Sequence, residues 1–506
     1  MNKKHFKLLI INIFFLNSSI LNGYQEFFNK NHIDSKIEKL WSPAKHSIET
    51  SISMLKESPI ELYFIGSETY NLLYYAFNKK KTPLIDELLQ LYLKTLPYIK
   101  KEKNYHIFHV SEDREKSEIR LEKPIYIWSN KDGDEELISS AQFLFVVSFA
   151  INKIISIPLL KRTKTMNLFI KSFQPILSSH YKRWIIGVKE KGGEKALGSF
   201  SRRGWGCKDN QENYIYARTL NQMIGELGEE SYHGATYCNV IADPSLLIIS
   251  GVGYYLAGLD NLQNTYTIPQ KKALTTFFIK SINILKQRFK ENTLQDSKNK
   301  TISILSFQEG YWFGHPDYYY SDYNNLNFPT EKEKKSNLSI GIDVNHASRV
   351  IYLLEMLEEN KNKFHLKFPS QNEMEMFTNS FFYNVFNQNY EKPLFKNFMN
   401  GSNGWFRVNY SSEKGYGYPP YKVGSEGALL GGYPRLAKYN KELEDVFIQL
   451  FKKLNSNKKE DRAFIHQFYE KSLWTEGKER EVYQFYEKRL SKKSSVYLIN
   501  FYSSLI

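Results

Sequence analysis

Cysteine is nearly absent from this chain, since only Cys207 and Cys238 occur among 506 residues. A single bridge and two buried thiols both fit that count, and a domain of this size needs neither. His233 lies five residues before Cys238, but this spacing matches no standard zinc motif. We therefore expect no metal site and no cofactor.

Long apolar runs are missing beyond the N-terminus. Three lysines precede the apolar run 8–16, which is too short to span a bilayer and is typical of a secretory signal. We expect residues 1–23 to be a signal peptide, the mature protein to be secreted or periplasmic, and no stable membrane span after cleavage. An uncleaved anchor is the alternative, because Leu21 is larger than the small residues preferred before a cleavage site.

Acidic residues are too few to balance the basic ones: the net charge is +15, or +12 without the three lysines of the signal. Much of this charge lies in lysine runs, which are usually solvated loops. A basic surface still attracts an acidic polymer such as a polyuronate or a sulfated glycan. We expect no nucleic acid as partner, because the chain has an export signal and no nucleic-acid-binding motif.

Strand-like alternation is scarce, whereas apolar residues recur at helical spacing in many segments of ten to twenty residues. The fold class expected is all-α, a single domain over residues 24–506 built from stacked helical hairpins. The helices are expected at 37–55, 68–78, 84–96, 135–155, 165–180, 214–227, 244–257, 271–289, 343–359, 372–386, 441–453 and 460–473. The polar insertions 291–300 and 330–337 are expected to be exposed loops.

Three aromatic, glycine-rich segments interrupt the helices, at 199–207, 306–323 and 400–432. Long loops in a compact helical domain are usually functional, and we expect these three at one end of the fold. Aromatic rings offer an apolar face to the C–H side of a sugar. The candidate sugar platforms are Tyr311, Trp312, Trp405, Tyr418 and Tyr421. The alternative is that many of these rings fill the core.

Three ionisable residues, Asp343, His346 and Arg349, lie three positions apart at the start of an apolar helical run. At this spacing they share one helix face. A carboxylate, an imidazole and a guanidinium there are suited to acid–base chemistry on an anionic or hydroxylated substrate. The alternative is an ordinary capping Asp343, with the other two residues on the solvent side.

Other candidate groups occur near helix ends and in the loops. Tyr232 and His233 follow several glutamates, so this segment offers both a phenol–imidazole pair and paired carboxylates. Glu309 precedes an aromatic pair, and Glu426 stands among glycines before an apolar run. Solvent-facing charges at helix ends are the alternative for each of these acids.

The paired helices, the aromatic loops and the Asp343-x-x-His346 helix start together resemble the six-hairpin (α/α) toroid proteins that process polysaccharides. This resemblance is architectural and matches no family fingerprint residue for residue. It implies a sugar-binding cleft at one rim, where Asp343, His346, Glu309, Tyr311, Trp312 and Glu426 would gather. Both hydrolases and uronate lyases occur among such toroids, so the architecture does not settle the reaction.

The sequence thus predicts an exported enzyme that cleaves an oligo- or polysaccharide, with an acidic one favoured by its charge. Hydrolysis would draw its acid and base from Glu309, Asp343 and Glu426. Elimination would use His346 or His233 with Tyr232 or Tyr311, while Arg349 neutralises the substrate carboxylate. The rival from another class is a non-catalytic glycan-binding or envelope-associated protein.

Overall fold

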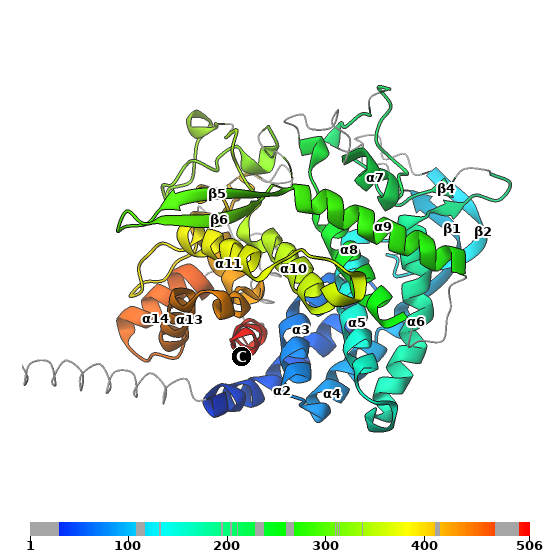
Figure 1. The fold of residues 1–506 in the computed structure, drawn as a ribbon, viewed down its shortest axis with the longest axis horizontal. Coiled ribbons are helices and arrows are strands. Elements are labelled where there is room, and N and C mark those ends of the chain that lie inside the picture. Colours follow the sequence, from blue (N-terminus) through cyan, green and yellow to red (C-terminus); the bar gives the residue numbers. More distant parts are fainter. Residues whose placement is uncertain are drawn as a thin grey trace, which may run out of the picture.

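The computed structural model describes residues 30–107, 117–130, 133–193, 196–202, 205–209, 211–227, 237–259, 268–308, 310, 312, 314–335, 337–409, 415–470 and 495–505. This part of the chain is mostly helical (Figure 1). Its α-helices are α2 (Lys30–Met54), α3 (Glu61–Asn78), α4 (Thr82–Leu93), α5 (Leu137–Ser156), α6 (Lys164–Ile185), α7 (Leu220–Leu227), α8 (Asp243–Gly258), α9 (Ile268–Gln287), α10 (Val344–Phe364), α11 (Gln371–Ser380), α12 (Lys422–Leu430), α13 (Lys441–Leu454), α14 (Lys459–Ile465) and a C-terminal helix over 495–504.

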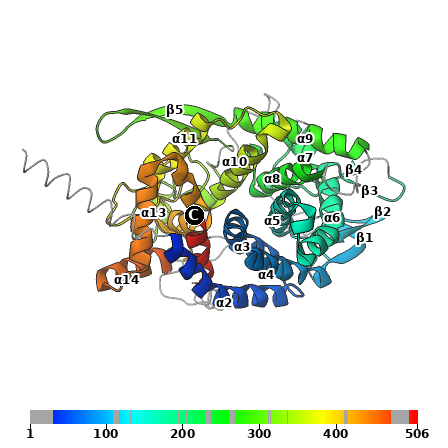
Figure 2. The ribbon, with the colours of Figure 1, turned by 60° about the horizontal axis from the view of Figure 1, so that its bottom comes forward.

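The inner helices contact one another in a closed circuit. Helix α3 packs on α5, α5 on α8, α8 on α10, α10 on α12, and α12 contacts α3. The C-terminal helix joins the circuit, because Asn500 donates to the carbonyl of Glu68 on α3 and Tyr497 donates to Glu426 on α12. Helices α2, α4, α6 and α9 lie outside this inner group (Figure 2).

Helices α5 and α8 are apolar on all sides, which is typical of helices buried in a core. Although no uninterrupted apolar run was expected, the stretches Leu137–Ser156 and Tyr237–Gly258 are long and apolar enough to cross a membrane by length and composition alone. Their most apolar windows are 89% and 83% buried within the structure. Both stretches therefore fit the core of a folded domain.

Three antiparallel hairpins add to the helices: β1 (Lys100–Ile107) with β2 (Ser117–Ile127), β3 (Val188–Lys189) with β4 (Ala196–Leu197), and β5 (Phe289–Gln295) with β6 (Thr301–Phe307). The insertion expected as an exposed loop at 291–300 is mostly exposed, but it forms the end of strand β5 and the turn of the third hairpin. Alternate residues of β6, including Ile302 and Ile304, are buried, and this strand packs on α11. The described residues of the second insertion, 330–335 and 337, are mostly exposed as expected.

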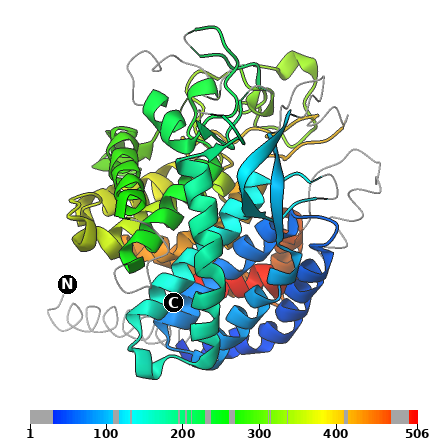
Figure 3. The ribbon, with the colours of Figure 1, turned by 90° about the vertical axis from the view of Figure 1, so that its right-hand side faces the viewer.

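Most of the expected helices are present, and one of them is shorter than expected. Two further helices are present that the sequence did not predict. The helix expected over 214–227 begins only at Leu220, because Tyr214 and Arg218 pair instead with Lys208 and Phe200 in extended bridges. Helix α12 lies within a segment expected to be loop, and the C-terminal helix was not expected at all. The long loops gather at one end of the helices (Figure 3), as the sequence suggested.

Candidate active site

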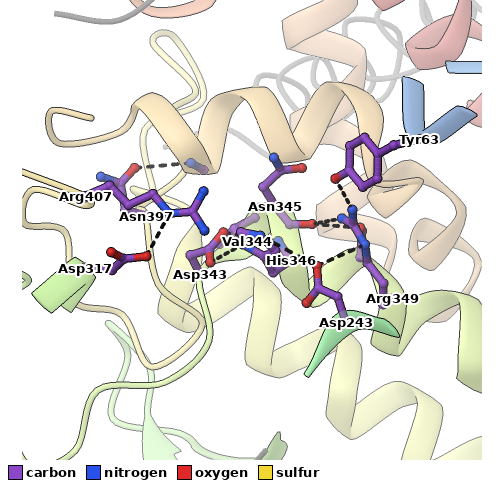
Figure 4. Close-up of polar contacts among 12 residues, drawn as sticks. Tyr63, Asp243, Asp317, Asp343, Val344, Asn345, His346, Arg349, Asn397 and Arg407 are labelled. Atoms are coloured by element: carbon purple, nitrogen blue, oxygen red, sulfur yellow. Dashed lines mark hydrogen bonds and ion pairs between the residues drawn. The ribbon is translucent and has the colours of Figure 1, made fainter. Parts of the chain in front are cut away.

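Asp343 caps helix α10 and orients a histidine on its first turn. The residue has extended backbone angles, and its Oδ1 accepts the backbone N–H of His346 at 3.1 Å. Its Oδ2 lies 2.5 Å from Nδ1 of His346 (Figure 4). Asp343 is fully buried, whereas the His346 side chain keeps 25% of its exposure. The carboxylate therefore holds the imidazole, and the imidazole is the group that a ligand can reach.

Helix α8 contributes a second carboxylate to this cluster. Asp243, the first residue of α8, places Oδ2 at 3.6 Å from Nε2 of His346 and at 3.7 Å from Nε of Arg349. The imidazole thus lies between two carboxylates from different helices. Asp243 was not singled out in the sequence, because an acid before proline at a helix start is an ordinary N-terminal feature.

Arg349 lies deeper than the sequence suggested, because its side chain is only 4% exposed. It donates to the hydroxyl of Tyr63 on α3, to the carbonyl of Asn345 at 2.8 Å and to Oγ of Ser348 at 2.8 Å. A guanidinium committed to these partners is placed to position Tyr63 and Asp243. Tyr63 was also missed, because the helix was expected to start only at residue 68.

The charges around His346 shift the pKa values of the pair in opposite directions. Burial alone would lower the pKa of His346, but attraction to Asp243 and Asp343 outweighs it, and the pKa is raised. Burial alone would raise the pKa of Asp343, but the neighbouring imidazole and its hydrogen bonds hold it below its usual value. Both shifts favour the ionised pair. The guanidinium of Arg407 opposes the rise for His346.

Arg407 lies in the third long loop, 400–432, and contributes a cation to the site. Its Nε donates to Oδ2 of Asp317 at 2.8 Å, which ties this loop to the second one (Figure 4). The ring of Phe406 lies 6.3 Å from that of His346. The Arg407 side chain keeps 28% of its exposure, so it is the more accessible of the two guanidinium groups near His346.

An aromatic cluster extends from this point. Trp312 stacks on Tyr318 with ring centres 4.9 Å apart, and Tyr318 contacts Phe406. On its other side Trp312 meets Trp205 at 6.0 Å and His315 at 5.3 Å. Trp205 is 37% exposed. We call Trp205, Tyr237, Trp312 and His315 the aromatic platform; all four rings are in mutual contact or share a neighbour.

A disulfide connects the two chain segments that carry Trp205 and Tyr237 of the aromatic platform. Cys207 and Cys238 are bonded, with Cα atoms 5.6 Å apart, so the bridge joins the segments that carry Trp205 and Tyr237. The Tyr237 hydroxyl also donates to the Trp205 carbonyl at 3.3 Å. Of the two alternatives that the sequence left open, the structure shows the bridge.

The remaining predicted platforms and acids lie elsewhere. Trp405 is 3% exposed and donates its Nε1 to the carbonyl of Asn325 at 2.7 Å, so it is a core residue. The ring of Tyr418 packs on that of Phe406. Tyr421 faces Phe468, and Glu426 accepts from Tyr497 at 3.2 Å. The carboxylates beside His346 are those of Asp243 and Asp343, whereas Glu426 contacts the C-terminal helix.

Four predicted site residues, Tyr232, His233, Glu309 and Tyr311, lie outside the described residues. In the part of the chain that is described, no group of three or more His, Cys, Asp or Glu side chains is placed to hold a metal ion. The candidate site is therefore built from residues of α3, α8, α10 and the two loops that meet at Arg407. The chain matches no family model, no curated protein and no solved structure, so the chemistry of this site rests on its own geometry.

Proposed function

We propose that this chain is an exported enzyme with an (α/α) toroid fold that cleaves an acidic oligo- or polysaccharide by β-elimination. The closed circuit of inner helices supports the toroid, and the long loops at one end support a cleft there. The disulfide supports export, because such bridges persist in oxidising compartments. The observation that carries the reaction is the buried Asp343, which presents an accessible His346.

In this proposal His346 acts as the general base. Its Nδ1–H is held by Asp343, which leaves Nε2 as the proton acceptor. Nε2 removes the proton from the carbon next to the uronate carboxylate. The electron pair forms a carbon–carbon double bond, and the adjacent carbon–oxygen bond to the leaving sugar breaks. The leaving oxygen takes a proton from the Tyr63 hydroxyl, which Arg349 positions.

A substrate carboxylate needs a cation that it can reach. Arg349 was the sequence-based candidate, but its burial and its contacts favour a positioning role. Arg407 is more exposed and lies close enough to lower the pKa of His346. We assign the neutralisation of the substrate carboxylate to Arg407, and the stacking of neighbouring sugar rings to the aromatic platform.

Hydrolysis is the second candidate, supported by Asp243. This carboxylate keeps 17% of its exposure and lies beside Nε2 of His346, so it offers an acid or base to a glycosidic oxygen. The same test separates the two reactions and the non-catalytic alternative. The protein is incubated with neutral and uronic polysaccharides while reducing ends and the ultraviolet absorbance of unsaturated uronides are followed.

New reducing ends with absorbance support elimination, and reducing ends without absorbance support hydrolysis. Binding without either signal supports a glycan-binding protein. His346→Gln should abolish the signal, while the matched control His365→Asn, at the other end of α10, should keep it. His365 has a left-handed φ of 53°, a conformation that asparagine tolerates well. Full activity in His346→Gln would refute the assignment of the base.

A further inference from the structure

A separate cavity of about 680 Å³ lies beside the candidate active site. It is enclosed by the β5–β6 hairpin, the end of α9, the segment 338–342 and one face of α10, elements that lie together in Figure 1. Its volume is within the range of about 300–1,000 Å³ that is typical of small-molecule sites. None of its described lining residues belongs to the cluster around His346.

The cavity and the active site share helix α10 but use different faces of it. Ala347 and Val350 line the cavity. Ala347 directly follows His346 in the sequence, and Val350 directly follows Arg349. One position is a rotation of about 100° around the helix axis. Ile342, which also lines the cavity, precedes the capping Asp343. The two sites are thus neighbours separated by the first turns of one helix.

The walls of the cavity combine an apolar floor with a polar rim. The floor includes Ile340, Val350 and Phe377, which are buried core residues. The rim carries amide and hydroxyl side chains that donate and accept hydrogen bonds; these are Gln287, Asn292, Ser306, Gln308, Ser339 and Asn400. The buried Asn239 also lines the cavity. Such a lining suits a ligand with hydroxyl groups at its edge and C–H groups on its face.

The charged side chains among the described lining residues are all basic. They are those of Arg288 and Lys290, and the described lining includes no aspartate or glutamate. A third cation, Arg202, lies close by: burial lowers its pKa to about 10, the carboxylate of Glu226 opposes this shift, and the charge of Arg288 adds to it. Arg202 donates to the carbonyls of Cys238 and Val240, on either side of the lining residue Asn239. This end of the cavity therefore favours an anion.

We propose that this cavity binds one uronic acid unit at a site separate from the His346 site. The carboxylate would pair with Arg288 and Lys290, the ring hydroxyls with the amide side chains, and a C–H face with the apolar floor. The choice of a sugar as ligand rests on the proposed function, whereas the preference for an anion rests on the cavity alone. The ligand is either a free uronate or the end unit of a longer glycan.

The test uses the full chain and measures binding of glucuronate, galacturonate, glucose and an acidic polysaccharide by calorimetry. The wild type and His346→Ala should bind a monomeric uronate equally well, and glucose at least tenfold more weakly. Arg288→Ala combined with Lys290→Ala should weaken uronate binding at least tenfold, because both charge-assisted contacts are lost. The matched control Lys298→Ala removes an exposed cation from the turn of the same hairpin and should leave binding unchanged.

Ser306→Trp, a substitution of a half-buried rim residue, should block the cavity without removing any charge. Loss of uronate binding in this variant, with polysaccharide cleavage retained, would support a separate site. Equal binding of uronate and glucose, or loss of uronate binding in His346→Ala alone, would overturn the proposal. Absence of any monosaccharide binding would also overturn it, while the cleavage assay would still decide the proposed function.

Discussion

The Nδ1 atom of His346 lies 2.5 Å from Oδ2 of Asp343, three residues earlier on the first turn of α10. The same carboxylate accepts the backbone N–H of His346 through its other oxygen. One buried side chain therefore has two functions: it caps the helix, and it fixes which imidazole nitrogen carries the proton. Substitutions at this position can separate the two.

Asp343→Asn should reduce the cleavage rate at least about 10²-fold while the protein remains folded. Asparagine is as good a helix cap as aspartate, but its neutral amide does not stabilise the imidazolium that forms when His346 takes a proton. Asp343→Ala should lose the cap as well, at a further cost of about 1 kcal/mol in the free energy of unfolding. Thermal unfolding and initial rates of both variants check this. An Asn variant with wild-type rates would show that Asp343 is only a cap.

The pH dependence of kcat/KM should report the ionisation of His346, because a general base must be neutral to accept a proton. Its raised pKa places the rise in activity above the ordinary value of about 6.5. Asp243→Asn removes an attraction and should move the rise to lower pH. Arg407→Gln removes a repulsion and should move it to higher pH. Shifts of the same sign in both variants would contradict the electrostatic assignment.

The same shift affects stability, with the opposite trend to activity. Because the folded-state pKa of His346 is raised, the folded protein binds its proton more tightly than the unfolded chain. This stabilisation is fully present below about pH 6.5, the ordinary pKa, and is lost as the pH rises through the folded-state pKa. Urea denaturation of the wild type and His346→Gln across this range should converge at high pH. A constant difference would exclude the linkage.

Tyr63→Phe should lower kcat about 10²-fold with little change in KM, because it removes the proton donor and keeps the ring. The Arg349 guanidinium would lose one of its partners but keep Asn345, Ser348 and Asp243. Tyr390→Phe, a change at an exposed tyrosine, is the matched control and should leave both constants unchanged. An increase in KM alone would assign Tyr63 to substrate binding.

Helical periodicity in the sequence predicted most of the fold, and the exceptions have identifiable causes. Helix α12 contains two glycines, Gly424 and Gly427, which lower helix propensity. Yet a Cβ on Gly427 would lie 3.0 Å from Val344, so this glycine is what lets α12 pack against the start of α10. Strand β6 does alternate, with Ile302 and Ile304 buried, but the lysine-rich turn before it favoured a loop.

The candidate site was predicted where its residues are close in sequence and missed where they are distant. Asp343, His346 and Arg349 are spaced three residues apart, so their spacing in the sequence was enough to predict that they lie on one face of a helix. Asp243 and Tyr63 come from α8 and α3, and only the packing of those helices on their neighbours places them at the site. A single sequence carries no signal for such long-range pairs. Burial likewise separates Trp405, a core residue, from the exposed Trp205.

The disulfide should control substrate binding more than the chemical step. The double variant Cys207→Ala with Cys238→Ala frees the segments that hold Trp205 and Tyr237, but it leaves Asp343 and His346 in place. We expect KM to rise about tenfold, which corresponds to about 1.4 kcal/mol of lost binding energy, with kcat within a few-fold of the wild type. Removing a bridge across 31 residues should also cost about 2–4 kcal/mol in the free energy of unfolding.

Reduction of the wild type with dithiothreitol should reproduce the rise in KM, and the double variant should not respond to the reductant. Trp205→Ala in the oxidised protein should raise KM by a similar factor, because it removes the exposed ring that the bridge positions. A drop in kcat at unchanged KM in the double variant would show that the bridge supports the geometry of His346 instead. That result would show that the position of His346 depends on the aromatic platform, through the ring contacts of Trp312, Tyr318 and Phe406.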